Sequence, residues 1–232
     1  MLKSKLERLK QAGDALQPWR NLKPLDRVLI LSAHPDDEIL SSAGLIQRAL
    51  AVGAKVRVVE VTDGNRRGKR AKRRLEVASA LAVLGLPEKA LQFWDFPDGR
   101  LWGHQELTSR IEQELAQFEP SVVLASDPLD SHKDHRYLGQ TVAQLRVHYP
   151  QIEWLFSLIH FSRFPRPIGY LPQLPLLPPA HCPGEWRTLN LTPYQVVKKA
   201  QAIKQFRSQL FTPLLRGLMF SFMRPNEIFR QL

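Results

Sequence analysis

One histidine and three acidic residues follow an apolar stretch of the sequence. Residues 33–38 read AHPDDE, and the β-branched residues before them predict a buried strand. Acids and proline favour the first turn of a helix, but capping accounts for only one or two of the acids. His34 and Asp37, three residues apart across a tight turn, can also converge on one cation. Three acids in a row beside a histidine therefore favour a metal site over a simple helix cap.

A second polar motif follows another apolar stretch. Residues 131–135 read SHKDH and come after the stretch 121–125 and a turn at 126–128. As an ordinary polar loop, the motif would only need Asp134 to cap the next helix. The carboxyl ends of neighbouring parallel strands meet, however, and this would bring His135 to His34 and Asp37. Two imidazoles and one carboxylate, with open positions for water, form the ligand set of a catalytic zinc site.

The elements that must position these motifs alternate between strands and helices. We expect strands at 27–33, 55–62, 91–96, 121–125 and 152–159, and helices from the first motif to Leu50 and over 69–84, 105–118, 135–147 and 193–210. The alternation predicts an α/β fold, with a Rossmann-like, mostly parallel sheet flanked by helices, in a single domain over residues 1–232. Three segments fall outside it: an N-terminal helical extension at 1–24, a Pro-rich loop at 164–186 and an apolar, basic tail at 211–232.

The composition limits the classes of protein to consider. The only cysteine among the 232 residues is Cys182, which excludes an internal disulfide framework and a cysteine-rich zinc module. The stretch from Met1 to Trp19 has no apolar run long enough for a signal peptide, and no apolar run approaches the ~20 residues of a membrane span. We therefore expect a soluble, cytoplasmic protein.

The charge is strongly basic, with a formal net charge of +11. Seven of the nine residues 66–74 are basic, which fits a solvated surface, a phosphate or lipid-headgroup contact, or nucleic acid. Nucleic acid is the least favoured, because no aromatic residue for base stacking lies within this run. The tail, with Arg216 and Arg224 among apolar residues, predicts either a peripheral contact with an anionic membrane or packing on the domain's own core.

The two motifs together resemble those of the PIG-L-type (LmbE-like) N-acetylglucosaminyl deacetylases, zinc enzymes that remove acetyl groups from amino sugars. The first motif matches at every position, and the second departs only at Lys133, where proline is common. Short supporting matches run through most of the chain, although the Pro-rich section has no counterpart. They are Thr62-Asp63-Gly64, Arg73-x-x-Glu76, Pro97-Asp98-Gly99, Ser208-Gln209 and Asn226-Glu227-x-Phe229.

The resemblance implies a role for each site residue. One zinc ion would be bound by His34, Asp37 and His135, and Asp36 would be the general base that takes a proton from the attacking water. His132, a cation held by Asp134, would stabilise the oxyanion and help to protonate the leaving amine. Sugar hydroxyls would contact Arg73 and Asp98. The other histidines belong to no second polar cluster, and we do not expect them to be metal ligands: His104, His148, His160 and His181.

The activity implied is hydrolysis of the N-acetyl group of an N-acetylglucosamine-type glycoconjugate, which could be lipid-linked or phosphorylated. Two alternatives stay open from the residues: a deacylase of another small amide, and a basic nucleic-acid-binding module in which the acids are helix caps. The second alternative leaves the pairing of the two motifs at strand ends unexplained.

Overall fold

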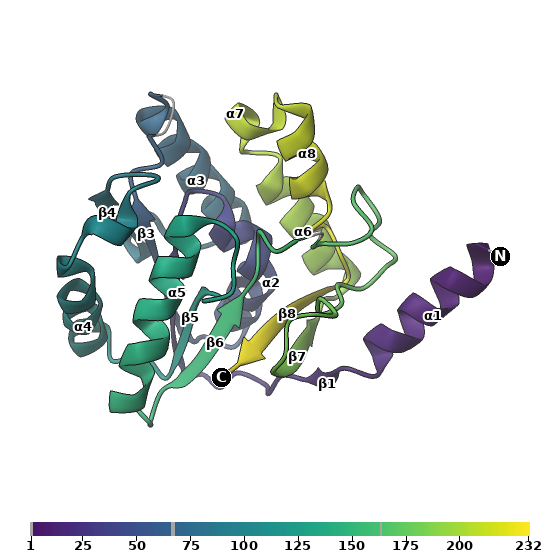
Figure 1. The fold of residues 1–232 in the computed structure, drawn as a ribbon, viewed down its shortest axis with the longest axis horizontal. Coiled ribbons are helices and arrows are strands. Elements are labelled where there is room, and N and C mark those ends of the chain that lie inside the picture. The colour runs from purple at the N-terminus through teal and green to yellow at the C-terminus, as the bar shows by residue number, and fades with distance from the viewer. Residues whose placement is uncertain (1, 66–67, 163) are drawn as a thin grey trace.

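Eight strands and eight α-helices make up the fold in the computed structural model, which describes residues 2–65, 68–162 and 164–232 (Figure 1). The strands are β1 (Gln17–Pro18), β2 (Arg27–Ser32), β3 (Lys55–Thr62), β4 (Leu91–Phe96), β5 (Val122–Ser126), β6 (Glu153–Ser157), β7 (Glu185–Asn190) and β8 (Asn226–Gln231). The helices are α1 (Leu2–Asp14), α2 (Asp37–Ala51), α3 (Arg70–Leu84), α4 (Glu106–Phe118), α5 (Lys133–Leu145), α6 (Pro193–Ile203), α7 (Arg207–Leu210) and α8 (Pro213–Phe220). Short 3₁₀ helices are η1 (Glu88–Ala90), η2 (Leu101–Gly103) and η3 (Arg146–His148).

The strands form one mixed sheet in the order β1-β7-β8-β6-β5-β2-β3-β4. Every pairing is parallel except those of β8, which runs antiparallel to both β6 and β7. The predicted α/β class, with a mostly parallel sheet flanked by helices, is confirmed. The chain leaves β2 toward β3 on one side and later returns to place β5 on the other, so a topological switch point lies between β2 and β5.

Alternate residues of the central strands pack into two separate hydrophobic cores, one on each face of the sheet. Val28 and Ile30 of β2 belong to the core under α2, α3 and α6, whereas Leu29 and Leu31 belong to the core under α4 and α5. A strand covered on both faces must be apolar at successive positions, since successive side chains point to opposite faces. This is why residues 28–31 of β2 read as a continuous apolar run in the sequence.

The C-terminal segment is part of the fold. Asn226–Gln231 forms β8 inside the sheet, and Met219, Phe222 and Met223 are buried. Arg224 is fully buried as well, and it donates to the carbonyls of residues 167, 171 and 221. The prediction that Arg224 faces an anionic membrane is therefore wrong, and much of the apolar set packs on the domain's own core.

The remaining excursions are attached to the sheet. Residues 17–18 form β1 beside β7, and Trp19 enters the core, so only α1 projects from the body in Figure 1. Between residues 164 and 184 there is no helix and no strand, as expected for the Pro-rich loop. Asn226 holds this loop to the sheet by exchanging hydrogen bonds with the backbone of Leu176. Among the described residues, no helix is long and apolar enough to cross a membrane.

Candidate metal centre and catalytic site

The carboxyl end of β2 delivers the first motif to the switch point. The chain leaves the strand at Ser32 and enters α2 at Asp37, and hydroxyls on neighbouring strands fix the turn between them. Ser32 Oγ donates to the His34 carbonyl at 2.8 Å, and Thr62 Oγ1 donates to the Ala33 carbonyl at 2.7 Å. These hydrogen bonds hold the backbone on both sides of His34, so the imidazole is aimed before any ligand binds.

Gly64 explains why Thr62-Asp63-Gly64 accompanies the first motif. Its φ of +61° lies in the left-handed region, and an added Cβ would lie 2.9 Å from the Pro35 ring. Only a residue without a side chain lets this turn pack so closely against the His34–Asp37 turn. The glycine therefore brings the loop after β3 directly against the candidate site.

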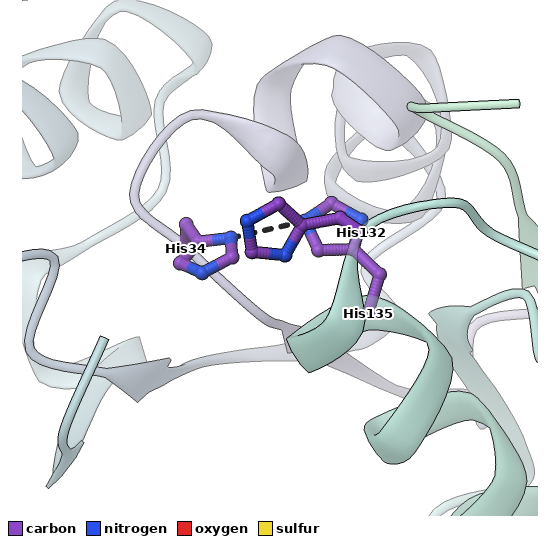
Figure 2. A group of neighbouring side chains, drawn as sticks. All are labelled: His34, His132 and His135. Atoms are coloured by element: carbon purple, nitrogen blue, oxygen red, sulfur yellow. Dashed lines mark hydrogen bonds between the residues drawn. The ribbon is translucent and has the colours of Figure 1, made fainter. Parts of the chain in front are cut away.

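Three ligand atoms from the two motifs converge, as the sequence predicted. His34 Nδ1 lies 3.0 Å from His135 Nε2, and Asp37 Oδ2 lies 3.0 Å from His135 Nε2 and 3.6 Å from His34 Nδ1. Figure 2 shows the His34 and His135 rings side by side with His132 next to them. All three ligand-bearing residues are buried, with 7% exposure for His34, 5% for Asp37 and none for His135.

These distances fit one zinc ion. Bonds of 2.0–2.2 Å in tetrahedral geometry place neighbouring ligand atoms about 3.4 Å apart, within the range found here. The same cluster can also be grouped as His34, His132 and His135. We favour Asp37 over His132 because its carboxylate supplies negative charge to the cation, while His132 Nδ1 already accepts a hydrogen bond from the Asp134 backbone. The His/Asp cluster can bind a metal ion.

Two buried carboxylates orient the imidazoles from behind. Asp130 Oδ2 lies 3.3 Å from His135 Nδ1, and Asp134 Oδ2 lies 2.9 Å from His34 Nε2. Such partners hold the ring and leave the opposite nitrogen free for a metal. Asp130 was not among the predicted site residues, and it also accepts the backbone N–H groups of His132, Ile159 and His160.

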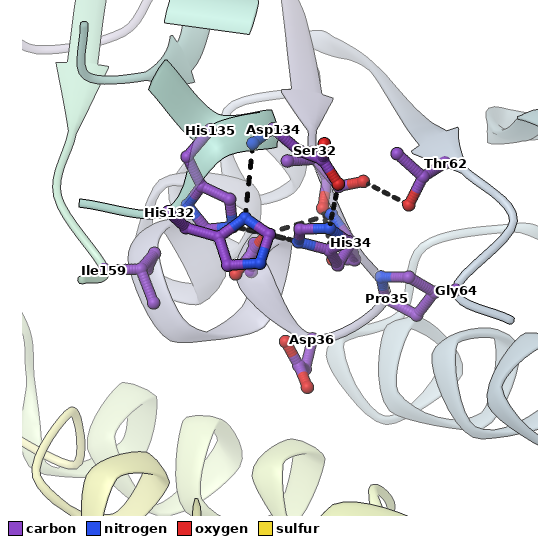
Figure 3. Close-up of polar contacts among 12 residues, drawn as sticks. Ser32, His34, Pro35, Asp36, Thr62, Gly64, His132, Asp134, His135 and Ile159 are labelled. Atoms are coloured by element: carbon purple, nitrogen blue, oxygen red, sulfur yellow. Dashed lines mark hydrogen bonds and ion pairs between the residues drawn. The ribbon is translucent and has the colours of Figure 1, made fainter. Parts of the chain in front are cut away.

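The expected pairing of the Asp134 carboxylate with His132 is wrong. That carboxylate accepts the backbone N–H groups of Gly99 and Leu101 in addition to contacting His34. His132 is instead the residue before α5, and its Nδ1 accepts the Asp134 backbone N–H at 3.3 Å (Figure 3). Burial, and then the neighbouring histidines His34 and His135, lower the pKa of His132 to about 4. The arrangement therefore favours a neutral His132 with its proton on Nε2 over the cation that we expected.

Asp36 stands apart from the imidazoles, toward the cleft, as Figure 3 shows. Its carboxylate is 3.2 Å from Arg73 Nη2, and Arg73 also donates to the Pro35 carbonyl. Burial raises the pKa of Asp36 to about 7, with Arg73 opposing the rise and Asp37 adding to it. Asp36 is thus available as a proton acceptor near neutral pH, and Arg73 orients it.

Asp98 also lies at the centre. Its carboxylate oxygens are 3.3 Å from His34 Nε2 and 3.7 Å from Arg73 Nη1. Both Arg73 and Asp98 line the cleft, so the structure brings the two predicted sugar contacts to the metal cluster. Their contacts with Asp36 and His34 give them a positioning role that the sequence did not indicate.

Behind Asp36 lies a buried pair of carboxyl groups. Glu38 Oε2 accepts the Asp36 backbone N–H at 2.9 Å, and the fully buried Glu60 of β3 faces Glu38. Burial, followed by the proximity of Glu38, raises the pKa of Glu60 well above its usual value. Glu38 is fully buried as well, so it supports the helix start and has no access to the cleft.

A protonated Glu60 makes stability depend on pH. The pKa of Glu60 is raised in the folded state. Its contribution to the free energy of unfolding is therefore fully present below the pKa of the unfolded chain, near 4.5, and is lost as the pH rises toward the pKa in the folded protein. Within this range the free energy of unfolding falls by about 1.4 kcal/mol per pH unit, which lowers Tm by roughly 3–6 °C per pH unit for a domain of this size. We expect Glu60→Gln, which is always neutral, to flatten the decline of Tm between pH 6 and 9.

Thermal unfolding followed by circular dichroism tests this prediction. Glu112 is exposed on α4, so Glu112→Gln is a matched control and should follow the wild-type curve. Parallel curves for wild type and Glu60→Gln across this pH range would show that Glu60 is ionised in the folded protein.

The cluster opens into a cleft of about 350 Å³. His160 lines it, with ring centroids 5.1 Å from His135 and 5.7 Å from His132, although the sequence did not place it among the candidate site residues. His160 follows β6, the strand next to β5, and its position could have been found from the same strand-end rule. The opposite rim carries Ser208, Gln209 and side chains of α8.

Residues of the short supporting motifs form hydrogen bonds and an ion pair between the elements around the site. Ser208 donates from its backbone and its hydroxyl to the buried Glu76 of α3, at 2.7 and 2.6 Å. Glu227 accepts the backbone N–H groups of Gly44 and Leu45 and pairs with the buried Lys199 at 2.7 Å. These contacts hold α7 beside α3 and anchor β8 to α2 behind the cluster.

The basic run divides between the site and the surface. Arg73 lies in the site, whereas Arg70 and Arg74 pair with Asp95. Arg66 and Arg67, which belong to the run, lie outside the described residues.

The fold and the site together define an α/β protein with a candidate catalytic metal centre at the switch point of its sheet. The model of the PIG-L family, described as GlcNAc-PI de-N-acetylase, matches residues 29–145. The chain belongs to the PIG-L family, which confirms the resemblance.

Individual relatives agree with this assignment. A diacetylchitobiose deacetylase of Thermococcus kodakarensis is 30% identical over 135 residues, covering 53% of this chain and 49% of the relative. The chain thus spans about half the length of that curated relative. The N,N'-diacetylchitobiose deacetylase of Pyrococcus horikoshii has TM-score 0.66 and 21% identity, covering all of this chain and 93% of that one. The A40926 pseudoaglycone deacetylase Dbv21 has TM-score 0.67 and 20% identity, covering 88% and 96%.

The fold alone does not fix the reaction. The 4-carboxy-2-hydroxymuconate hydratase GalB of Pseudomonas putida KT2440 also has it, with TM-score 0.56 and 18% identity over 85% of this chain and 83% of that one. The case for function must therefore come from the side chains of the site.

Proposed function

We propose that the chain is a zinc-dependent amide hydrolase that removes the N-acetyl group from an N-acetylglucosamine-type glycoconjugate. The observation that carries this proposal is the convergence of His34, Asp37 and His135 at the switch point, with Asp36 beside them in the cleft. Deacetylases among the family's relatives support the same reaction.

The bound ion would acidify the attacking water and polarise the amide carbonyl. Asp36, oriented by Arg73, accepts the proton of the water as its oxygen bonds to the carbonyl carbon. The carbon–nitrogen bond then breaks, and the proton taken by Asp36 can pass to the departing amine. Acetate and a free amino sugar are the products, with no residue acting as a covalent nucleophile.

His132 is placed to donate to the oxygen that becomes negative. Because Nδ1 accepts the Asp134 backbone N–H, the proton lies on Nε2, and this proton can stabilise the oxyanion. Asp134 acts indirectly, by holding His34 and the turn that carries Asp98. Arg73 and Asp98 remain the proposed contacts for sugar hydroxyls.

We expect His132→Ala to lower kcat by about 10²–10³-fold, the cost of removing one oxyanion donor, with a much smaller change in KM. An oxyanion contact forms mainly in the transition state, so substrate binding should suffer little. Steady-state kinetics together with metal analysis tests this. Retained metal separates this role from that of a ligand, and a variant altered only in KM would make His132 a substrate-binding residue.

Acetate release from a panel of N-acetylglucosamine conjugates tests the proposed function directly. Zinc-loaded protein should release acetate from at least one conjugate, chelator should abolish release, and added zinc should restore it. If N-acetylated amines without a sugar are hydrolysed and the sugar conjugates are not, the protein is a deacylase of another small amide. Failure with every amide would overturn the proposal.

A further inference from the structure

The cleft has two walls of different chemistry. One wall carries the metal cluster with Asp36, Arg73 and Asp98, and the other is formed by α8 together with Ser208, Gln209 and Thr212, which precede it. The α8 side chains that line the cleft are all apolar: Leu214, Leu215, Leu218 and Met219. A sugar ring presents hydroxyl groups that need donors and acceptors, and these side chains offer none.

Packing of the core explains only part of the apolar wall. Met219 is 2% exposed and belongs to the core, and the half-buried Leu218 packs against that core, but Leu214 is 82% exposed and the half-buried Leu215 has no part in it. Residues four apart on a helix share a face, so Leu214 lies beside Leu218, and Leu215 beside Met219. A single exposed leucine needs no explanation, whereas two adjacent apolar rows in a cleft mark a place where a ligand can bury an apolar group.

The wall is held firmly in place. Upstream, Ser208 of α7 donates two hydrogen bonds to the buried Glu76. Downstream, the buried Arg224 donates to the carbonyls of Ser221, Leu171 and Pro167. The apolar rows are therefore set before substrate binds, which lowers the cost of binding.

We propose that this wall is a subsite for an apolar chain carried by the amino-sugar substrate. The chain would be either an N-acyl group longer than acetyl or an alkyl or aryl group on the anomeric carbon; both bring the same chemistry to α8. The proposal rests on the proposed function for the position of the sugar. It extends that function by naming an amphiphilic substrate class.

Two substrate series distinguish the sources of the chain. The first is methyl and hexyl N-acetyl-β-D-glucosaminide, used below their critical micelle concentrations, and the second is N-acetyl- and N-hexanoyl-glucosamine. One methylene in an enclosed pocket changes kcat/KM by roughly 10- to 200-fold. This wall is partly open, so the gain per methylene should be smaller. We expect kcat/KM for the longer substrate to exceed kcat/KM for the shorter one by about tenfold or more in one of the two series.

The double variant Leu214→Gln/Leu218→Gln should bring the ratio of kcat/KM for the longer and shorter substrates close to one. Leu75 is 70% exposed on α3 and lies outside the cleft, so Leu75→Gln is the matched control and should keep the wild-type ratio. Circular dichroism checks that both variants fold, and sedimentation velocity gives their oligomeric state.

A binding measurement separates this proposal from the proposed function. Hexyl β-D-glucoside has no amide, and calorimetry should show that it binds about tenfold more tightly than methyl β-D-glucoside to wild type but not to the double variant. If this holds while no amide is hydrolysed, the subsite stands and the proposed reaction is wrong. Equal kcat/KM within both series together with equal binding would overturn the subsite. A double variant that changes oligomeric state instead of selectivity would also overturn it, because α8 would then be a subunit interface.

Discussion

His135→Ala is expected to lose its metal and essentially all of its turnover. His135 is the one proposed ligand from the second motif, and its Nε2 lies 3.0 Å from both His34 Nδ1 and Asp37 Oδ2. Because His135 is fully buried, its substitution by alanine also leaves a cavity beside the other two proposed ligands. Removing a residue that only orients a ligand weakens metal binding by about 10–100-fold, and removing the ligand itself should cost more than that.

Elemental analysis after dialysis is the measurement. Wild type should hold close to one equivalent of zinc, and so should His148→Ala, which removes an exposed histidine outside the cleft. Asp130→Asn, which leaves the ligand but weakens its orientation, should fall between wild type and His135→Ala. Metal-free wild-type protein that still hydrolyses its substrate would contradict the metal assignment, and metal loss in His132→Ala but not in Asp37→Asn would give the third ligand position to His132.

The convergence of the proposed ligands could be predicted from the sequence because their positions follow from topology. His34 and the segment with His135 each come directly after an apolar strand, and adjacent parallel strands present their carboxyl ends together. The strands themselves were visible because they are covered on both faces and are apolar throughout. The expected bounds of β3 and β4 match those in the structure.

One strand that the sequence did not predict, β8, is polar in sequence but buried in the structure. In β8, Asn226, Glu227 and Arg230 are all at most 5% exposed, and each has a partner far away in the chain. Arg230, for example, pairs with the buried Asp127 after β5. Such partners cannot be seen in a local window, so no strand was predicted within the apolar, basic tail at 211–232. Its antiparallel direction was hidden for the same reason.

The assignment of carboxylates to histidines failed at Asp134 because it depends on side-chain direction. Asp134 and His135 are adjacent in the first turn of α5, and consecutive helical residues point about 100° apart. Asp134 therefore reaches His34 and the turn at Gly99, whereas His135 meets Asp130 from the loop before the helix. The family resemblance implied a pairing with His132, but helix geometry decides the partner.

Asp36→Asn should keep the metal and lower turnover by about 10²-fold or more, since it preserves shape and removes the proton acceptor. A base works only when ionised, and burial raises the pKa of Asp36 to about 7, against the effect of Arg73. In wild type kcat/KM should therefore fall as pH is lowered through this region. A bound cation favours the carboxylate and moves the fall to lower pH.

The pH profile of kcat/KM, measured with zinc content on the same samples, tests this role for Asp36. The acidic fall should be absent from the residual activity of Asp36→Asn, while Asp14→Asn, on the exposed side of α1, should keep both the rate and the profile of wild type. Turnover near the wild-type value in Asp36→Asn would place the base elsewhere.

Glu38 could not replace Asp36 as the base, because Glu38 is fully buried and its carboxylate accepts the Asp36 backbone N–H. The base would then have to be sought among the residues that line the cleft, with Asp98 and His160 as the nearest alternatives.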